Sequence, residues 1–305
     1  MPRAGVTATP RVTIGVPVYN GERYLAEALG SAAAQTEPEM EVLILDNAST
    51  DATADIAQDF VRRDPRFRYR RHATNIGPVA NYNALVPLAR APLFKWLPAD
   101  DRMEPGFILA CVEALDADPR IVLATTRLEM IGVDGEPLPP DPSGRYRLAA
   151  AGERVPDRPS IAGLVAAPQP VDRFRNVLHG MFGIQISTYM YGVIRTDVLR
   201  RTGLEGAYPG GDKVILAELA LHGPFLEVPQ LLWSCRIHPQ HLGGLDPAVL
   251  EGALRGRPSP RIRRMRIDQL LGYLGAIRRA PLGWGERAGC VRALVGRGRD
   301  LGARA

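Results

Sequence analysis

The sequence has very little lysine and cysteine, and it lacks any long apolar run. Among its 305 residues only Lys95 and Lys213 are lysines, so arginine supplies nearly all of the basic groups. No stretch of eighteen consecutive apolar residues occurs, and no segment is therefore expected to span a membrane. The first residues, MPRAGVTATP, lack the apolar core of a signal peptide, which favours a cytoplasmic protein.

The cysteines exclude a disulfide framework. Cys111, Cys235 and Cys290 are far apart in the chain, and none has the C-x-x-C spacing of a metal site. In a cytoplasmic protein such cysteines are expected to remain reduced thiols.

The positive charge lies mainly at the C-terminal end. Residues 251–305 carry thirteen arginines and four acidic residues, a net charge of +9, so the preceding 250 residues carry 5 − 9 = −4. We therefore expect a mildly acidic body, residues 1–250, followed by a basic helical extension, residues 251–305. We expect no nucleic-acid partner.

In the first half of the chain, apolar runs of strand length alternate with helical patterns. The expected strands are 11–18, 41–46, 66–71, 93–97 and 120–131, and the expected helices are 21–35, 47–63, 77–89 and 107–115. Ser49 or Thr50 is the expected cap of the second helix, and Pro87 is expected to end or kink the third. Such alternation predicts an α/β protein with a mostly parallel sheet covered by helices on both faces.

The second half of the chain is less regular. Eight prolines fall within residues 135–170, which predicts a long surface loop. A helix is expected over 171–183, a strand over 186–195 and a helix over 212–223. In the extension, Ile267, Leu270, Leu271 and Leu274 form an apolar stripe at helical spacing with arginines at its flanks. We expect this stripe to pack against the body; contact with anionic lipid is the alternative.

Polar groups follow three of the expected strands. Tyr19 follows the first strand, Asp46 ends the second, and Asp100 and Asp101 follow the fourth. In parallel sheets, ligands bind beyond the carboxyl ends of the strands, where the strand order reverses. Two adjacent carboxylates repel each other unless a base, water or a cation lies between them. The sequence therefore predicts that the two carboxylates lie at the mouth of a nucleotide-sized cleft.

Six motifs in order resemble the family 2 glycosyltransferases, which are enzymes of the GT-A fold that use nucleotide-diphosphate sugars. The similarity covers roughly residues 11–238. The motifs are VPVYNGERYLAEAL, LDNASTDAT, RRHATNIGPVANYN, FKWLPADD, GGDKVILAELALHG and CRIH. The resemblance implies a GT-A domain at 1–250, with a nucleotide-binding half at 1–130 and an acceptor-side half at 131–250.

The resemblance also implies a role for individual residues. It assigns the uridine-binding turn to Pro17, Val18 and Tyr19, and further nucleotide contacts to Asp46, Arg71, Asn75 and Asp100. Asp101 and His238 are the implied ligands of Mn²⁺ or Mg²⁺, and Asp212 is the implied general base. Three positions depart from the common motifs: Pro98, Asn47 and Gly211 stand where an acidic residue is frequent.

Some of these residues also have purely structural interpretations. Asp212 follows two glycines and also fits a helix cap, and Asp46 also fits a strand end that caps the next helix. His238 is equally compatible with a packed surface histidine. The adjacent Asp100 and Asp101 also fit a solvated turn, although their position after an apolar strand favours a site.

The implied reaction is inverting transfer of a sugar from a UDP-sugar to an acceptor hydroxyl. A divalent ion held by carboxylates neutralises the departing diphosphate, and one carboxylate takes the acceptor proton. The acceptor is a glycan, a lipid-linked glycan or a small natural product. The expected location is the cytoplasm, with contact to the inner face of the membrane as an option.

Two other classes remain as alternatives. A sugar-1-phosphate nucleotidyltransferase has a similar nucleotide domain, but it requires a glycine-rich basic loop where VPVYNGE stands. A catalytically silent relative that only binds a nucleotide sugar is favoured by Pro98 and by the single acid Asp212.

Overall fold

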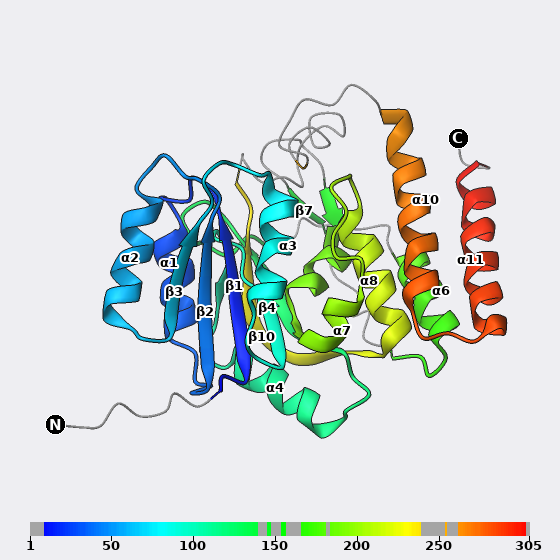
Figure 1. Ribbon diagram of the computed structural model, residues 1–305, viewed down its shortest axis with the longest axis horizontal. Coiled ribbons are helices and arrows are strands. Elements are labelled where there is room, and N and C mark those ends of the chain that lie inside the picture. The colour runs from blue at the N-terminus through cyan, green and yellow to red at the C-terminus, as the bar shows by residue number, and fades with distance from the viewer. Residues whose placement is uncertain are drawn as a thin grey trace.

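In the computed structural model, an eight-stranded sheet forms the centre of the molecule, and helices cover both of its faces (Figure 1). The structure describes residues 9–139, 145–147, 154–156, 166–180, 184–238, 254 and 262–302. Most of the predicted loop at 135–170 lies outside these residues. None of the described helices is long and apolar enough to cross a bilayer.

The strands of the main sheet follow the order β3-β2-β1-β4-β9-β6-β10-β5. Their bounds are β1 Val12–Val18, β2 Met40–Asp46, β3 Phe67–Arg71, β4 Leu93–Trp96, β5 Arg102–Met103, β6 Leu123–Ile131, β9 Val193–Arg195 and β10 Phe225–Arg236. Strands β7 Arg145–Arg147 and β8 Arg154–Pro156 form a separate antiparallel pair. Of the strands in the main sheet, β9 and β5 run antiparallel to their neighbours.

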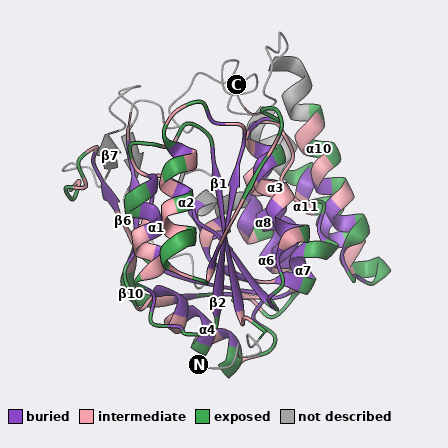
Figure 2. Cartoon of the chain, turned by 60° about the vertical axis from the view of Figure 1, so that its left-hand side comes forward, coloured by how far each residue is buried: buried purple, intermediate pink, exposed green. Residues whose placement is uncertain are grey.

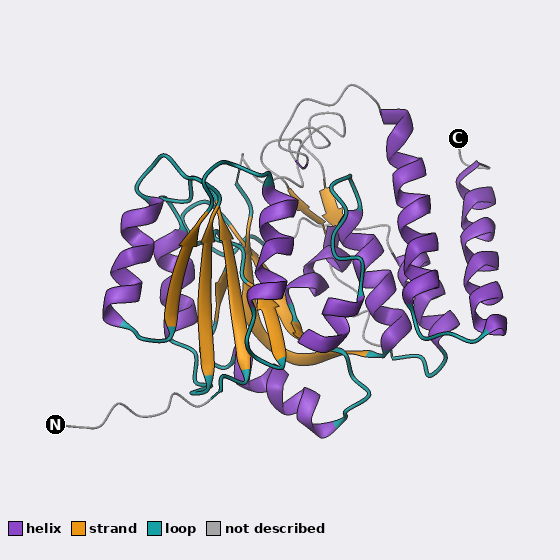
Figure 3. Ribbon diagram, in the orientation of Figure 1, coloured by secondary structure: helices purple, strands orange, loops and turns teal. Residues whose placement is uncertain are grey.

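The helices confirm most of the predicted pattern (Figure 3). Their bounds are α1 Leu25–Ala33, α2 Thr53–Arg63, α3 Pro78–Leu88, α4 Phe107–Ala117, α6 Pro170–Gly180, α7 Thr196–Arg201, α8 Gly211–His222, α10 Ile262–Arg279 and α11 Trp284–Gly302, with a 3-10 helix η1 at Ile184–Tyr191. Pro87 lies in the last turn of α3, which ends one residue later.

Two hydrophobic cores lie on opposite faces of the sheet because side chains alternate along each strand. On β2, Val42 and Ile44 pack into the core that α1 and α4 help to form, whereas Leu43 and Leu45 pack into the core below α3 and α8. Figure 2 shows the strands buried at the centre and the exposed residues on the outer sides of the helices.

Gly15 on β1 allows α3 to pack closely on the sheet. A Cβ atom at this position would lie 2.9 Å from Cζ of Phe94 and 3.1 Å from Cδ1 of Leu85 on α3. Such distances are shorter than normal carbon contacts, so a larger residue would push α3 away. This packing matters for the site because α3 begins beside the carboxyl end of β1.

Strand β1 lies between β2 and β4 and is parallel to both. The chain therefore leaves β1 in one direction to form β2 and later returns to the other side to form β4. A crevice forms at such a reversal of strand order, beyond the carboxyl ends of the strands. The predicted site residues Tyr19, Asp46 and Asp100 all follow or end these three strands.

Three local predictions were wrong. Ser49 and Thr50 do not cap α2, whose first residue is Thr53; the Ser49 hydroxyl instead accepts the backbone N–H of Asn20. The segment 186–195 is mostly 3-10 helix, and only Val193–Arg195 is a strand. The apolar stripe of the extension does not pack against the body: Ile267, Leu270, Leu271 and Leu274 are exposed.

Candidate active site

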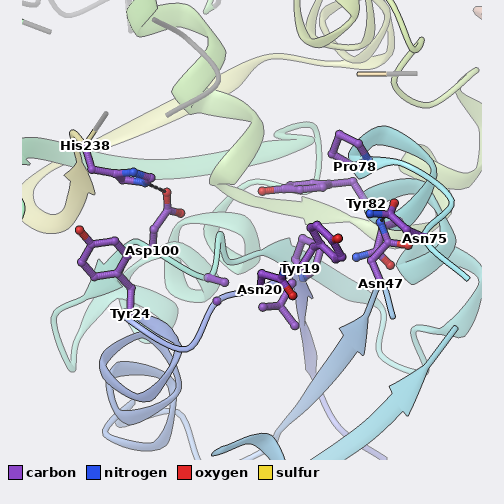
Figure 4. Close-up of a pocket in the computed structure, with 14 residues that line it drawn as sticks. Tyr19, Asn20, Tyr24, Asn47, Asn75, Pro78, Tyr82, Asp100 and His238 are labelled. Carbon is purple, nitrogen blue, oxygen red and sulfur yellow. Dashed lines mark hydrogen bonds and ion pairs between the residues drawn. The ribbon is translucent and has the colours of Figure 1, made fainter. Parts of the chain in front are cut away.

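A cavity of about 440 Å³ lies at the carboxyl ends of β1, β2 and β4 (Figure 4). Six of the ten predicted site residues line it: Pro17, Val18, Tyr19, Asn75, Asp100 and His238. The described residues that complete the lining are Asn20, Gly21, Tyr24, Asn47, Pro78, Asn81, Tyr82 and Ala99. Asp46, Arg71, Asp101 and Asp212 are not part of the lining.

Asp100 and His238 form a pair on one wall of the cavity. Nε2 of His238 lies 2.9 Å from Oδ2 of Asp100, and the exposed fractions of the two side chains are 10% and 28%. The ring of Tyr24 lies 5.3 Å from the His238 ring, on the side away from Tyr19 (Figure 4). A carboxylate and an imidazole are thus held together at the edge of the cavity.

Arg236 holds the Asp100–Asp101 loop against the end of β10. Its backbone N–H donates to Oδ1 of Asp101 at 2.9 Å, and its Nε donates to the main-chain oxygen of Asp100 at 2.8 Å. The other guanidinium nitrogens donate to the main-chain oxygen of Gly132 and to the carboxylate of Glu27. Only 1% of Arg236 is exposed. In the CRIH motif, the arginine therefore fixes the loop and the histidine contacts the carboxylate that the loop presents.

Asp101 lies behind the cavity wall. It is 4% exposed, and its carboxylate accepts the backbone N–H of Arg236. Burial raises the pKa of Asp101 well above its ordinary value, and the neighbouring charge of Asp100 raises it further. Of the two adjacent acids, Asp100 is therefore the one that faces the cavity.

Asp46 and Arg71 support the loop after β2. Oδ1 of Asp46 accepts the backbone N–H of Ser49, and Oδ2 accepts the hydroxyl of Tyr69 at 2.6 Å and Nη1 of Arg71 at 3.4 Å. Arg71 also donates to the main-chain oxygen of Ser49. Burial, followed by the Asp46 carboxylate, raises the pKa of Tyr69 to about 12. Asp46 is fully buried, so its side chain acts on the cavity through this loop.

The loop presents Asn47, which the sequence analysis noted only as a departure from a motif. Nδ2 of Asn47 donates to Oδ1 of Asn75 at 2.9 Å, and its Oδ1 accepts the backbone N–H of Ile76. Oδ1 of Asn75 also accepts the backbone N–H of Gly77, which has a φ of 86° and precedes α3. This chain of hydrogen bonds joins the end of β2 to the start of α3 and shapes one wall of the cavity.

Tyr82 contributes a phenol from α3. Its ring projects into the cavity in Figure 4. Burial raises the pKa of Tyr82 well above its ordinary value, and the charges of Asp100 and Asp101 raise it further. Tyr82 therefore remains a neutral hydroxyl. The sequence pattern did not indicate that Tyr82 lines the cavity, because the residue lies within a helical stretch where an aromatic side chain can equally pack in the core.

Asp212 lies in the first turn of α8, beside Glu205. Burial, followed by the charge of Asp212, raises the pKa of Glu205 to about 8. The main chain of Glu205 is fixed by Asn83, which donates to its carbonyl at 2.8 Å and accepts its N–H at 3.2 Å. Asn83 follows Tyr82 on α3, so this one helix contacts both the cavity and the carboxyl pair. The sequence analysis did not identify Glu205.

No group of three or more histidine, cysteine, aspartate or glutamate side chains in the described part of the chain is arranged to hold an ion by itself. Asp100 and His238 supply one oxygen and one nitrogen donor at the cavity wall. A carboxylate oxygen and an imidazole nitrogen are both donors that divalent metal ions accept, and two protein donors would leave positions for phosphate oxygens and water.

Similarity to known proteins identifies the domain and its fold. Residues 13–162 match the model of the family described as "Glycosyl transferase family 2". Chondroitin synthase of Escherichia coli is 31% identical over 132 residues, which are 43% of this chain but only 19% of that protein.

Two solved structures share the fold. One is TarS 1–349 of S. aureus in complex with UDP, with a TM-score of 0.59, 16% identity and coverage of 93% of this chain and 70% of that one. The other is the mannosyltransferase PcManGT of Pyrobaculum calidifontis in complex with GDP-Man and Mn²⁺, with a TM-score of 0.52, 16% identity and coverage of 97% and 80%. The chain has the GT-A fold, and its residues 13–162 belong to the family 2 glycosyltransferases.

Proposed function

We propose that this protein transfers a sugar from a UDP-sugar to an acceptor hydroxyl, with inversion at the anomeric carbon and with the help of a divalent cation. The observation that carries the proposal is the Asp100–His238 pair on the wall of a nucleotide-sized cavity within a family 2 domain. TarS, which shares the fold, has been solved with UDP and with UDP-GlcNAc.

In this proposal Asp100 and His238 hold Mn²⁺ or Mg²⁺. The sequence had assigned the metal to Asp101 and His238, but Asp101 faces away from the cavity and is hydrogen-bonded to Arg236. Asp101 then helps to hold the loop in place. A cation held by these two residues would supply positive charge to the departing diphosphate.

The nucleoside occupies the wall made by the β1 turn and the Asn47–Asn75 link. Tyr19 is 49% exposed and lines the cavity, so its ring is available to a base. Asp46 and Arg71, assigned to the nucleotide by the sequence, take a supporting role because both hold the loop that presents Asn47. PcManGT, which was solved with GDP-Man, makes a guanosine donor the second candidate.

Asp212 is the proposed general base. In a single displacement the acceptor oxygen forms a bond to the anomeric carbon while the bond to the diphosphate breaks, and the hydroxyl proton passes to the carboxylate of Asp212. Glu205, with a pKa raised to about 8, keeps its proton at neutral pH and so adds no charge next to Asp212. The acceptor then approaches from the side of α8.

The direct test is calorimetric titration of UDP into the purified protein, first with Mn²⁺ and then with a chelator. UDP binding that requires Mn²⁺ supports Asp100 and His238 as metal ligands. UDP binding that is unchanged by the chelator contradicts that role. If GDP binds and UDP does not, the donor is a GDP-sugar instead of a UDP-sugar.

Turnover separates the remaining alternatives. Release of UDP from a UDP-sugar in the presence of an acceptor hydroxyl supports the transferase. Formation of a nucleotide sugar from a sugar 1-phosphate identifies a nucleotidyltransferase instead. Tight nucleotide binding without turnover across glycan, lipid-linked and small-molecule acceptors identifies a silent relative. We place the reaction in the cytoplasm, in keeping with three buried, unpaired thiols.

A further inference from the structure

The outer face of helix α10 carries exposed apolar side chains. The exposed fractions are 55% for Ile267, 48% for Leu270, 59% for Leu271 and 39% for Leu274. These residues recur at intervals of three and four, so they form one continuous stripe on the helix. Isolated exposed leucines are common on protein surfaces, but four on one helix face indicate an interaction site.

The opposite face of α10 already has its partner in the body. Tyr273, Ala276 and Ile277 are buried in the core that α8 shares. Arg279 donates to both carboxylate oxygens of Glu218 on α8, at 2.7 and 2.9 Å. The helix is therefore firmly positioned, and the exposed stripe is a consequence of that position.

Helix α11 also carries exposed apolar side chains. It lies beside α10 at the edge of the molecule farthest from α2 (Figure 1). Cys290 and Leu294 pack inward, whereas Val291 and Val295 are 40% and 54% exposed. Trp284, at the start of α11, is 90% exposed. Figure 2 shows exposed residues along the outer sides of both helices.

Positive charge accompanies this apolar surface. Residues 251–305 carry the net charge of +9, and the exposed Arg278 lies eleven residues, about three helical turns, after Ile267. Arg292 is exposed on α11, next to Val291. Apolar stripes with arginine flanks and an exposed tryptophan are typical of helices that lie in the interface of a bilayer.

We propose that the exposed faces of α10 and α11 dock the protein on a membrane surface rich in anionic lipid. The apolar stripe enters the headgroup region, and the arginines contact lipid phosphates. A symmetric dimer through the same stripe is disfavoured, because it brings two segments of charge +9 together. This proposal does not depend on the sugar donor or on the metal.

The test is flotation of the full-length protein with vesicles of phosphatidylcholine alone or of an equimolar mixture with phosphatidylglycerol. We expect binding to the mixed vesicles only, with binding weakened by salt. The double variant Leu270→Gln, Leu271→Gln is expected to bind about tenfold or more weakly. In the double variant Arg278→Gln, Arg292→Gln, the affinity for the mixed vesicles is expected to fall about fivefold for each arginine.

Matched controls change exposed residues of the same types elsewhere. Leu226→Gln with Leu231→Gln on β10, and Arg62→Gln with Arg63→Gln on α2, should bind vesicles as the wild type does. Equal losses in the controls, or no binding by the wild type, overturn the proposal. A dimer that dissociates in Leu270→Gln, Leu271→Gln, without lipid binding, identifies a second copy as the occupant. Unchanged UDP binding and thermal unfolding in each variant establish that the fold is intact.

Discussion

Nε2 of His238 lies 2.9 Å from Oδ2 of Asp100, although 138 residues separate the two in the chain. The contact depends on two strand ends that the sheet brings together, β4 and β10. It also depends on Arg236, which lies two residues before His238 and donates from Nε to the main-chain oxygen of Asp100.

Replacing Asp100 with asparagine should remove the response of UDP binding to Mn²⁺. Residues that merely support metal ligands cost about 10- to 100-fold when changed, so loss of a ligand should weaken UDP binding in Mn²⁺ at least about tenfold. Calorimetry with and without chelator measures this effect. Asp55→Asn, at an exposed position on α2, is the control and should behave as wild type. A Mn²⁺ response retained in Asp100→Asn contradicts the assignment.

Replacing Arg236 with glutamine should destabilise the whole protein. The change removes a buried cation and leaves the Asp100 carbonyl and the Glu27 carboxylate short of donors. We expect the free energy of unfolding to fall by about 3 kcal/mol, as measured by urea denaturation. Arg62→Gln, whose side chain is 65% exposed, should change it by less than about 0.5 kcal/mol. Similar stabilities for the two variants would mean that the Arg236 contacts are not important for the fold.

Asp212→Asn should separate binding from turnover. The change keeps the shape of the side chain but removes the proton acceptor, so UDP binding should stay unchanged while turnover falls roughly 100- to 10,000-fold. Steady-state kinetics and UDP calorimetry on the same preparation give both quantities. Normal turnover in Asp212→Asn would exclude this residue as the base.

Glu205 should make stability depend on pH. Its pKa is raised from 4.5 to about 8, so the folded protein holds a proton that the unfolded chain releases between these values. The stabilisation from this group is complete below about pH 4.5 and is lost as the pH rises through 8. Melting temperatures of wild type and Glu205→Gln across this range should diverge, with the wild type falling more steeply. Parallel curves for the two proteins would refute the shift.

Gly15 and Gly30 form a matched pair for the packing of α3. A Cβ on Gly15 meets Phe94 at 2.9 Å, so Gly15→Ala should cost about 1 to 3 kcal/mol. Gly30 lies within α1 with nothing within 4 Å of an added Cβ, and Gly30→Ala should instead stabilise by about 0.5 to 1 kcal/mol. Chemical denaturation of both variants checks the opposite signs, and a stabilising Gly15→Ala would show that α3 can move outward freely.

The sequence predicted the strands and helices of the first half because their apolar periodicity is strong. It also placed Asp100 and Asp101 at the site, but neighbours in a turn cannot be told apart by pattern. The direction of each carboxylate is decided by Arg236, whose backbone N–H binds Asp101 and leaves Asp100 toward the cavity. Likewise, Asp46 ends a strand as expected, yet Tyr69 and Arg71 on the adjacent strand engage its carboxylate.

The extension shows a different limit of sequence reasoning. Helix α10 has two apolar faces at the same spacing, one with Leu270 and Leu274 and the other with Tyr273 and Ile277. Periodicity detects both faces, but it cannot say which one meets the body. The face with Tyr273 and Ile277 meets the body because of the Arg279–Glu218 ion pair and the core beside α8. Both of these are tertiary contacts.

The region that matches the family ends at residue 162, whereas His238 closes the cavity from the end of β10. During synthesis, the walls contributed by β1, β2 and β4 leave the ribosome long before their histidine partner does. A nascent chain that ends before β10 therefore lacks the Asp100–His238 pair. Asp101 gains its contact with Arg236, and Asp100 gains its contact with His238, only when β10 pairs with β6. Formation of the Asp100–His238 pair therefore requires that β10 has joined the sheet.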